Sequence, residues 1–158
     1  MQLRIFLFLI LICNFHFTFS QNLNAQKSAL EKVFKKSILQ PRKSKISIGE
    51  NSWKLCIEAN NNEILLYETK FEKFNDCCRY INWTFYKKDK FIKNISNLCS
   101  EPPLSTVTTG DDWYKIEYTT ESNNLILNII SKSNTEKFVV EEILKRTDGL
   151  HIIKLLKL

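Results

Sequence analysis

The chain has 158 residues and a mildly basic balance, with 23 Lys and Arg side chains against 17 Asp and Glu. This length suits one domain with a hydrophobic core of its own. The lysines are scattered among acidic residues, so they form no continuous basic stripe with aromatic stacking positions. Composition therefore argues against a nucleic-acid partner.

The opening segment is typical of a secretory signal peptide. Arg4 precedes an unbroken apolar run over residues 5–12, and Thr18 and Ser20 are the small residues before a cleavage site. We place cleavage before Gln21. The chain is thus expected to be exported, to the periplasm or beyond the cell.

Two forms of membrane attachment were weighed against export. The apolar run is shorter than the about 20 residues of a membrane-spanning helix, so no stable membrane span is expected. Lipid attachment at Cys13 would need a small residue before the cysteine, and Ile12 is bulky. Removal of the leader takes away one cation and no acid, which leaves a net charge of about +5.

The segment over residues 24–40 has the period of an amphipathic helix. Its apolar positions recur at helical spacing and are Leu30, Val33, Phe34 and Ile38. Pro41 ends the pattern, which predicts a helix of about three turns. We expect this helix to pack against the body of the domain.

Beyond the helix the apolar residues no longer recur at helical spacing but at every second position, as in a strand. Alternating runs predict a hairpin over residues 53–71 and strands over residues 80–87, 91–96, 113–119, 125–131, 138–145 and 150–158. About eight strands with short turns and no intervening helix predict an antiparallel up-and-down barrel, which leaves no exposed sheet edge. The expected organisation is a signal peptide (1–20), a helix with its connection (21–50) and a barrel domain (51–158).

Four cysteines remain after the leader, at Cys56, Cys77, Cys78 and Cys99. An even number in an exported chain predicts two disulfides. Their spacing does not match a zinc site or a redox Cys-x-x-Cys pair. Of the three pairings, one joins the two adjacent cysteines in a strained ring, but neighbouring side chains on a strand point to opposite faces. The adjacent cysteines are therefore expected to reach different partners.

No combination of residues supports catalysis. His151 is the only histidine beyond the leader and lies in an alternating strand. The adjacent carboxylates Asp111–Asp112 and Glu141–Glu142 face opposite ways on a strand and cannot flank one bond. The sequence therefore predicts a protein that is not an enzyme, with no catalytic residues, metal ligands or cofactor.

Three runs carry a resemblance to a known family: "CCRYINWTFYKKDKFIKNISNLC", "TGDDWYKIEYTTESNNLILNI" and "KFVVEEILKRTDGLHIIKL". Together they resemble the bacterial lipocalin-like domain family of exported proteins. The matched positions are Cys77, Trp83, Thr84, Phe85, Asp89, Phe91, Cys99, Gly110, Trp113, Leu125 and Leu127, with Trp53 to Leu55 fitting the first strand. The resemblance implies a lipocalin-like barrel and a disulfide between Cys77 and Cys99, which leaves Cys56 with Cys78.

The resemblance also implies a function in binding. The barrel interior is expected to hold a small hydrophobic molecule, lined by Trp53, Trp83, Phe85, Phe91 and Trp113. The alternative is a protein-interaction or inhibitor module of the cell envelope, with a filled barrel and a protein partner. A void lined by apolar side chains would favour the first, and a filled interior with an exposed apolar patch would favour the second.

Overall fold

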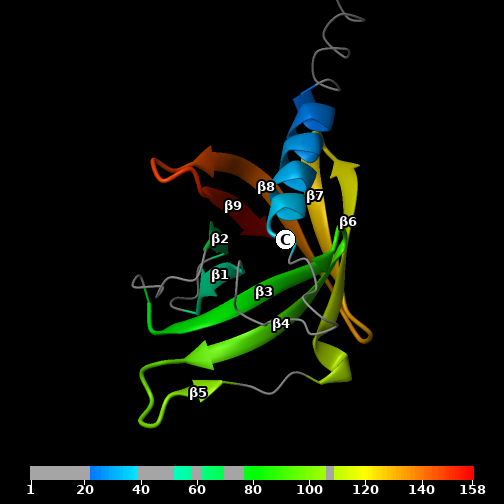
Figure 1. Ribbon diagram of the computed structural model, residues 1–158. Coiled ribbons are helices and arrows are strands. Elements are labelled where there is room, and N and C mark those ends of the chain that lie inside the picture. The colour runs from blue at the N-terminus through cyan, green and yellow to red at the C-terminus, as the bar shows by residue number, and fades with distance from the viewer. Residues whose placement is uncertain (1–21, 39–51, 58–61, 70–76, 106–108) are drawn as a thin grey trace, which may run out of the picture.

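The computed structural model describes residues 22–38, 52–57, 62–69, 77–105 and 109–158. Over these ranges the chain forms a closed antiparallel barrel of eight strands with one short helix at its mouth (Figure 1). The predicted fold class, a mainly β chain with an antiparallel barrel and an N-terminal helix, is confirmed. The signal-peptide and lipidation predictions and the connection after the helix lie outside the described residues.

The helix covers residues 22–36. The barrel strands are β1 (Trp53–Cys56), β2 (Glu63–Glu68), β3 (Arg79–Lys87), β4 (Lys90–Asn97), β6 (Trp113–Glu121), β7 (Asn124–Ile130), β8 (Thr135–Lys145) and β9 (His151–Lys157). A two-residue strand, β5 (Leu104–Ser105), pairs with the end of β4, and a single 3-10 turn, η1 (Gly110–Asp112), precedes β6. The predicted strands are all found, and β5 is an addition.

Around the barrel the strands follow the order β1, β2, β9, β8, β7, β6, β4 and β3, and β3 pairs with β1 to close the ring. Strands β6 to β9 form a meander in which each pairs with the next. Strand β1 lies between β2 and β3, so β2 meets the last strand, β9. Closure leaves no unpaired strand among these eight.

Side chains along each strand point alternately into the barrel and away from it, and this alternation decides which of them fill the interior. On β3, Ile81, Trp83 and Phe85 join the core, while Asn82 and Thr84 lie on the opposite face. Facing strands supply the remaining large core side chains: Trp53, Leu66, Phe91, Ile116, Leu125, Leu127, Ile129, Phe138, Ile153 and Leu155. The apolar alternation in the sequence therefore corresponds to one continuous core inside the barrel.

The helix is part of this core. Leu30, Val33 and Phe34 belong to the same buried cluster as the barrel side chains. The Phe34 ring lies 5.2 Å from Trp53 and 4.6 Å from Phe85, measured between ring centroids. The Nε1–H group of Trp53 donates a 2.9 Å hydrogen bond to Oγ of Ser37, just beyond the helix. The amphipathic helix thus closes one end of the barrel. We call this end of the barrel the helix end.

Two polar contacts link the helix to the barrel. Glu31 pairs with Lys88 at the turn between β3 and β4, with 2.8 Å between Oε2 and Nζ. Nζ of Lys27 lies 5.7 Å from the ring centroid of Tyr118 on β6. Exposed ion pairs contribute little to stability, so these contacts orient the helix more than they hold it.

Tyr118 provides a test of this packing. Burial raises the pKa of its hydroxyl well above the ordinary value of 10.0, and the carboxylates of Glu31 and Asp89 act in the same direction. The folded chain keeps this proton above pH 10 while the unfolded chain releases it, so stability should fall as pH rises above about 10. In urea unfolding between pH 9 and 11, Tyr118→Phe should lose less stability than the wild type. Equal losses would show that Tyr118 is not buried by the helix.

The two disulfides join different cysteines from those that the family resemblance implied. Cys56 is bonded to Cys77 and Cys78 to Cys99, with Cα–Cα distances of 5.9 and 5.4 Å. The implied pairing of Cys77 with Cys99 and of Cys56 with Cys78 is therefore wrong. The four cysteines are nevertheless all bonded, and the adjacent pair serves two different bridges, as strand geometry predicted.

Strand order explains the pairing. β3 lies between β1 and β4, so the segment that leads into it has a neighbour on each side. On one side Cys56 is the register partner of Tyr80 and lies close to Cys77. On the other side the carbonyl of Cys78 accepts a 2.6 Å hydrogen bond from the amide of Leu98, next to Cys99. Each cysteine thus bonds to the strand that lies on its own side.

His151 has a structural partner that the sequence did not indicate. Both its ring Nδ1 and its backbone amide lie near Oε2 of Glu68, at 2.6 and 3.0 Å. The two side chains join the end of β2 to the start of β9 and are largely buried. This pair accounts for the position of His151 without a catalytic task.

Among the residues that the structure describes, no helix is long and apolar enough to cross a membrane. Within the same ranges, no three His, Cys, Asp or Glu side chains gather in a way that could hold a metal ion.

Candidate functional site

The five aromatic side chains expected to line a ligand site do not form one. Trp53, Trp83, Phe85 and Phe91 point into the barrel as predicted, but each is at most 2% exposed. They pack on one another: Trp83 stacks on Phe91 at 4.7 Å, and Phe85 lies 5.3 Å from Phe91. These four residues are core.

Trp113 faces the opposite way from its expected direction. It is 46% exposed and makes an edge contact with Tyr86 on the outer face, with 4.9 Å between ring centroids. Its neighbours Tyr114 and Ile116 occupy the inward side of β6. Trp113 therefore shares the outward side with Lys115, and the prediction that it lines the interior is wrong.

Among the residues that the structure describes, the side chains in the middle of the barrel are tightly packed. Leu66, Phe85, Phe91, Leu127 and Ile153 have no accessible surface at all. A side chain without accessible surface has no water-sized space beside it, so these residues fill their part of the interior. Phe34 of the helix completes the filling from the helix end.

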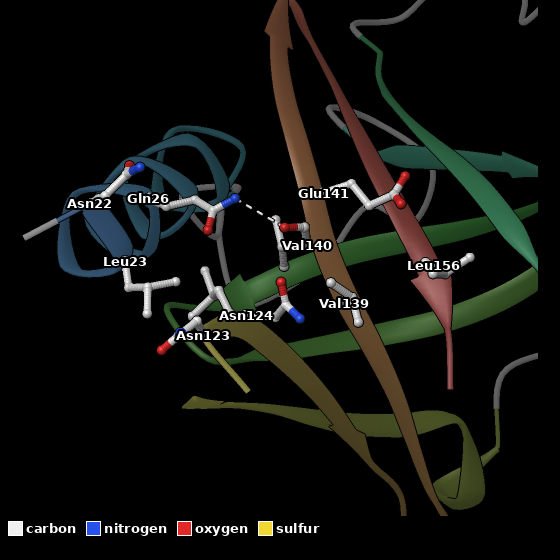
Figure 2. Close-up of a pocket in the computed structure, with 10 residues that line it drawn as sticks. Asn22, Leu23, Gln26, Asn123, Asn124, Val139, Val140, Glu141 and Leu156 are labelled. Atoms are coloured by element: carbon white, nitrogen blue, oxygen red, sulfur yellow. Dashed lines mark hydrogen bonds between the residues drawn. The ribbon is translucent and has the colours of Figure 1, made fainter. Parts of the chain in front are cut away.

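The candidate site lies instead at the helix end, between the helix and the β7–β8–β9 sheet (Figure 2). A cavity of about 500 Å³ opens there, which we call the helix-end cavity. Its lining residues are Asn22, Leu23, Gln26, Asn123, Asn124, Leu125, Val139, Val140, Glu141 and Leu156. Cavities of this size hold small ligands in many proteins.

Two backbone features shape the helix-end cavity. The pairing of β8 with β9 shifts register between Val140 and Glu142, so β8 bulges at this point. At the β6–β7 turn, Ser122 and Asn123 have positive φ angles of 48° and 62°, as a two-residue type I′ hairpin requires. Bulges are frequent beside functional sites. The cavity thus lies where the sheet departs from regular geometry.

Gln26 connects the helix to the bulge. Its Nε2 donates a 3.0 Å hydrogen bond to the carbonyl oxygen of Val140 (Figure 2). This bond fixes the orientation of the carboxamide and leaves Oε1 as an acceptor on the cavity side. Leu23 of the helix and Asn123 and Asn124 of the β6–β7 turn also line the cavity.

The lining combines amide groups with aliphatic side chains. Asn22, Gln26, Asn123 and Asn124 each carry a carboxamide, which both donates and accepts hydrogen bonds. The charged residue among them, Glu141, is exposed and shares Lys154 with Glu63, with Nζ–Oε2 distances of 3.3 and 3.0 Å. The lining therefore offers hydrogen-bonding groups and aliphatic surface to a neutral polar molecule, and it contains no cation that would attract an anion.

Comparisons with known proteins add no relative. No protein-family model, no curated protein and no solved structure matches this chain. The lipocalin-like resemblance therefore stays a prediction, and the helix-end cavity is interpreted from its own residues.

Sequence reasoning did not identify the helix-end cavity. Gln26 lies within the helix expected over residues 24–40, and Asn123 and Asn124 lie between two expected strands, so no local pattern singles them out. Their meeting depends on the position of the helix relative to β8, which no local pattern specifies. The one signal in the sequence is that four carboxamide residues lie near the start of the helix and in the β6–β7 turn. Such residues are also common in helix caps and turns, so the signal does not distinguish binding from local structure.

Proposed function

We propose that this chain is an exported binding protein that holds a small ligand in the helix-end cavity, outside the barrel core. The observation that carries the proposal is the cavity itself. It has a volume of about 500 Å³ and is lined by the helix, the β6–β7 turn and strands β8 and β9, with four carboxamide and several aliphatic side chains. The packing of the core supports this location, because the four inward-pointing aromatic side chains expected to line a site inside the barrel are at most 2% exposed. No chemistry is assigned, since the lining residues suit recognition.

Two observations support export. The chain holds two disulfides, which persist in oxidising compartments and are rare in the cytosol. The sequence also opens with the pattern of a signal peptide. A lipocalin-like family relationship would be consistent with both, and it belongs to the same proposal.

The proposal is tested by filling the cavity. Val139→Trp enlarges a side chain that lines the cavity and should displace any ligand. The matched control is Ile130→Trp, which places the same side chain at a half-buried position of β7 away from the cavity. Both variants are purified from the cells that export them and examined by native mass spectrometry with the wild type.

The expected result is a bound small molecule on the wild type and on Ile130→Trp, and none on Val139→Trp. The protein is also incubated with the low-mass fraction of its own growth medium, so that a ligand lost during purification can rebind. A wild-type chain that stays bare after incubation, with both disulfides intact, would contradict the proposal.

A second function is favoured by a separate observation. Beyond the barrel core, Ile95, Leu98, Leu104 and Trp113 are between 39% and 59% exposed. Large exposed apolar side chains together with a filled interior are the pattern expected of a protein-interaction module of the envelope. In that case Leu104→Ser and Trp113→Ser would abolish co-purification of a partner, while Val139→Trp would leave it unchanged.

A further inference from the structure

The helix-end cavity has walls on three sides, and this shape restricts the ligand. The helix supplies one wall through Asn22, Leu23 and Gln26, and the β6–β7 turn supplies another through Asn123 and Asn124. The third wall is β8 with its neighbour β9 (Figure 2). A cavity enclosed in this way suits a compact molecule better than an extended chain that must continue past both ends.

The carboxamides restrict the ligand further. Each offers an oxygen that accepts and an NH₂ group that donates, so together they match groups that do both. Hydroxyl groups have this property, because each carries one donor and two acceptor lone pairs. Gln26 is half-buried and Asn22, Asn123 and Asn124 are exposed, so a purely apolar ligand would gain nothing from these groups and would desolvate Gln26.

The charge and the aliphatic residues of the lining place two more restrictions on the ligand. Glu141 shares Lys154 with Glu63, and the other lining residues are uncharged, so an anionic ligand would find no cation in the lining. Leu23, Leu125, Val139 and Leu156 form an aliphatic side that would pack against C–H groups. The ligand therefore needs hydroxyls on one side and C–H groups on another.

We infer that the helix-end cavity binds a neutral saccharide of one or two rings. This inference rests on the proposed function and names the ligand class of the same site. A sugar ring presents neighbouring hydroxyls at its edge and C–H groups on its faces. Carboxamides of Gln26 and Asn124, on opposite walls, would bind hydroxyls, and Leu23 and Val139 would contact a ring face.

The test uses saturation-transfer NMR on the whole mature protein with six named probes. The neutral sugars are glucose, galactose, N-acetylglucosamine and maltose; glucuronic acid tests charge, and acetyl-Gly-Leu-Gly-amide tests a neutral peptide. At least one neutral sugar should show transfer, and the charged sugar and the peptide should show none. Asn124→Ala should weaken the bound sugar about tenfold, the effect of one lost hydrogen bond.

Two further variants make the result specific. Asn124→Asp keeps the side-chain shape but removes the NH₂ donor, so it should also weaken binding. Asn134→Ala removes an exposed carboxamide outside the cavity and should bind like the wild type. Unchanged thermal unfolding of all three variants would exclude misfolding as the cause.

The outcomes separate the ligand class from the proposed function. Absence of transfer from every neutral sugar would overturn the saccharide inference, as would glucuronic acid binding as well as glucose. If only the peptide binds, and Val139→Trp abolishes its binding, the class is wrong and the cavity function stands. A wild-type chain that carries no small molecule in native mass spectrometry would contradict the proposed function itself.

Discussion

Replacing Phe34 by alanine should lower the free energy of unfolding by about 3–5 kcal/mol, the usual cost of removing a buried phenylalanine ring. Phe34 has no accessible surface and lies against both Trp53 and Phe85. Its removal leaves a cavity at the point where the helix closes the barrel. Urea unfolding followed by tryptophan fluorescence measures the loss and also reports the environment of Trp53.

The control for Phe34→Ala is Lys35→Ala, the next residue of the same helix, which is exposed. That variant should change stability by less than about 0.5 kcal/mol, as surface substitutions usually do. If Phe34→Ala cost no more than its control, the helix would not be part of the core. A fluorescence change at low urea, before the far-ultraviolet circular dichroism of the barrel strands is lost, would show that the helix detaches as a separate unit.

This dependence on Phe34 links stability to the candidate site. The same helix closes the barrel through its C-terminal half and forms a wall of the cavity through Asn22, Leu23 and Gln26. A variant that loosens the helix should therefore weaken both the core and the cavity. For this reason the binding variants were chosen from β7 and β8, where a substitution changes the cavity and leaves Phe34 in place.

Much of the fold could be predicted because its causes are local. Strands such as β3 and β7 alternate or run apolar over their full length, and the helix carries its apolar residues at one spacing up to Pro41. The turn before β9 was also predictable, since Gly149 has a φ of +82° that glycine adopts without strain. Each of these features depends on a few neighbouring residues.

The orientation of Trp113 was predictable in principle and was missed. In the run Trp-Tyr-Lys-Ile-Glu-Tyr, the side that carries Trp113 also carries Lys115 and Glu117. Two charged residues on that side indicate solvent, and the structure places Tyr114, Ile116 and Tyr118 toward the core. The charges of Lys115 and Glu117 are therefore a better guide to the direction of Trp113 than the size of its ring.

The helix-end cavity and the cysteine pairing could not be predicted, because both depend on contacts between distant segments. Gln26 meets Val140 across 114 residues. The pairing of the cysteines depends on which strands flank β3, and several strand orders fit the same alternation. The cysteine pairing follows from the position of β1 between β2 and β3, which brings Cys56 beside Cys77.

The disulfide pairing predicts the largest difference between two closely related variants. Each bridge spans 21 residues, and closing a loop of that length stabilises a fold by about 3 kcal/mol in the chain-entropy model. Replacing Cys56 and Cys77 together by serine removes one bridge and should cost about 3 kcal/mol. Replacing Cys56 and Cys78 breaks both bridges and should cost about twice as much.

Thiol titration of the unfolded proteins distinguishes these variants without a stability measurement. The variant that lacks Cys56 and Cys77 should have no free thiol, because Cys78 and Cys99 stay bonded. The variant that lacks Cys56 and Cys78 should have two, since Cys77 and Cys99 face opposite neighbours of β3. The reverse result would restore the pairing implied by the family resemblance. It would also require Cys77 to face β4, which contradicts the contact of Cys77 with β1.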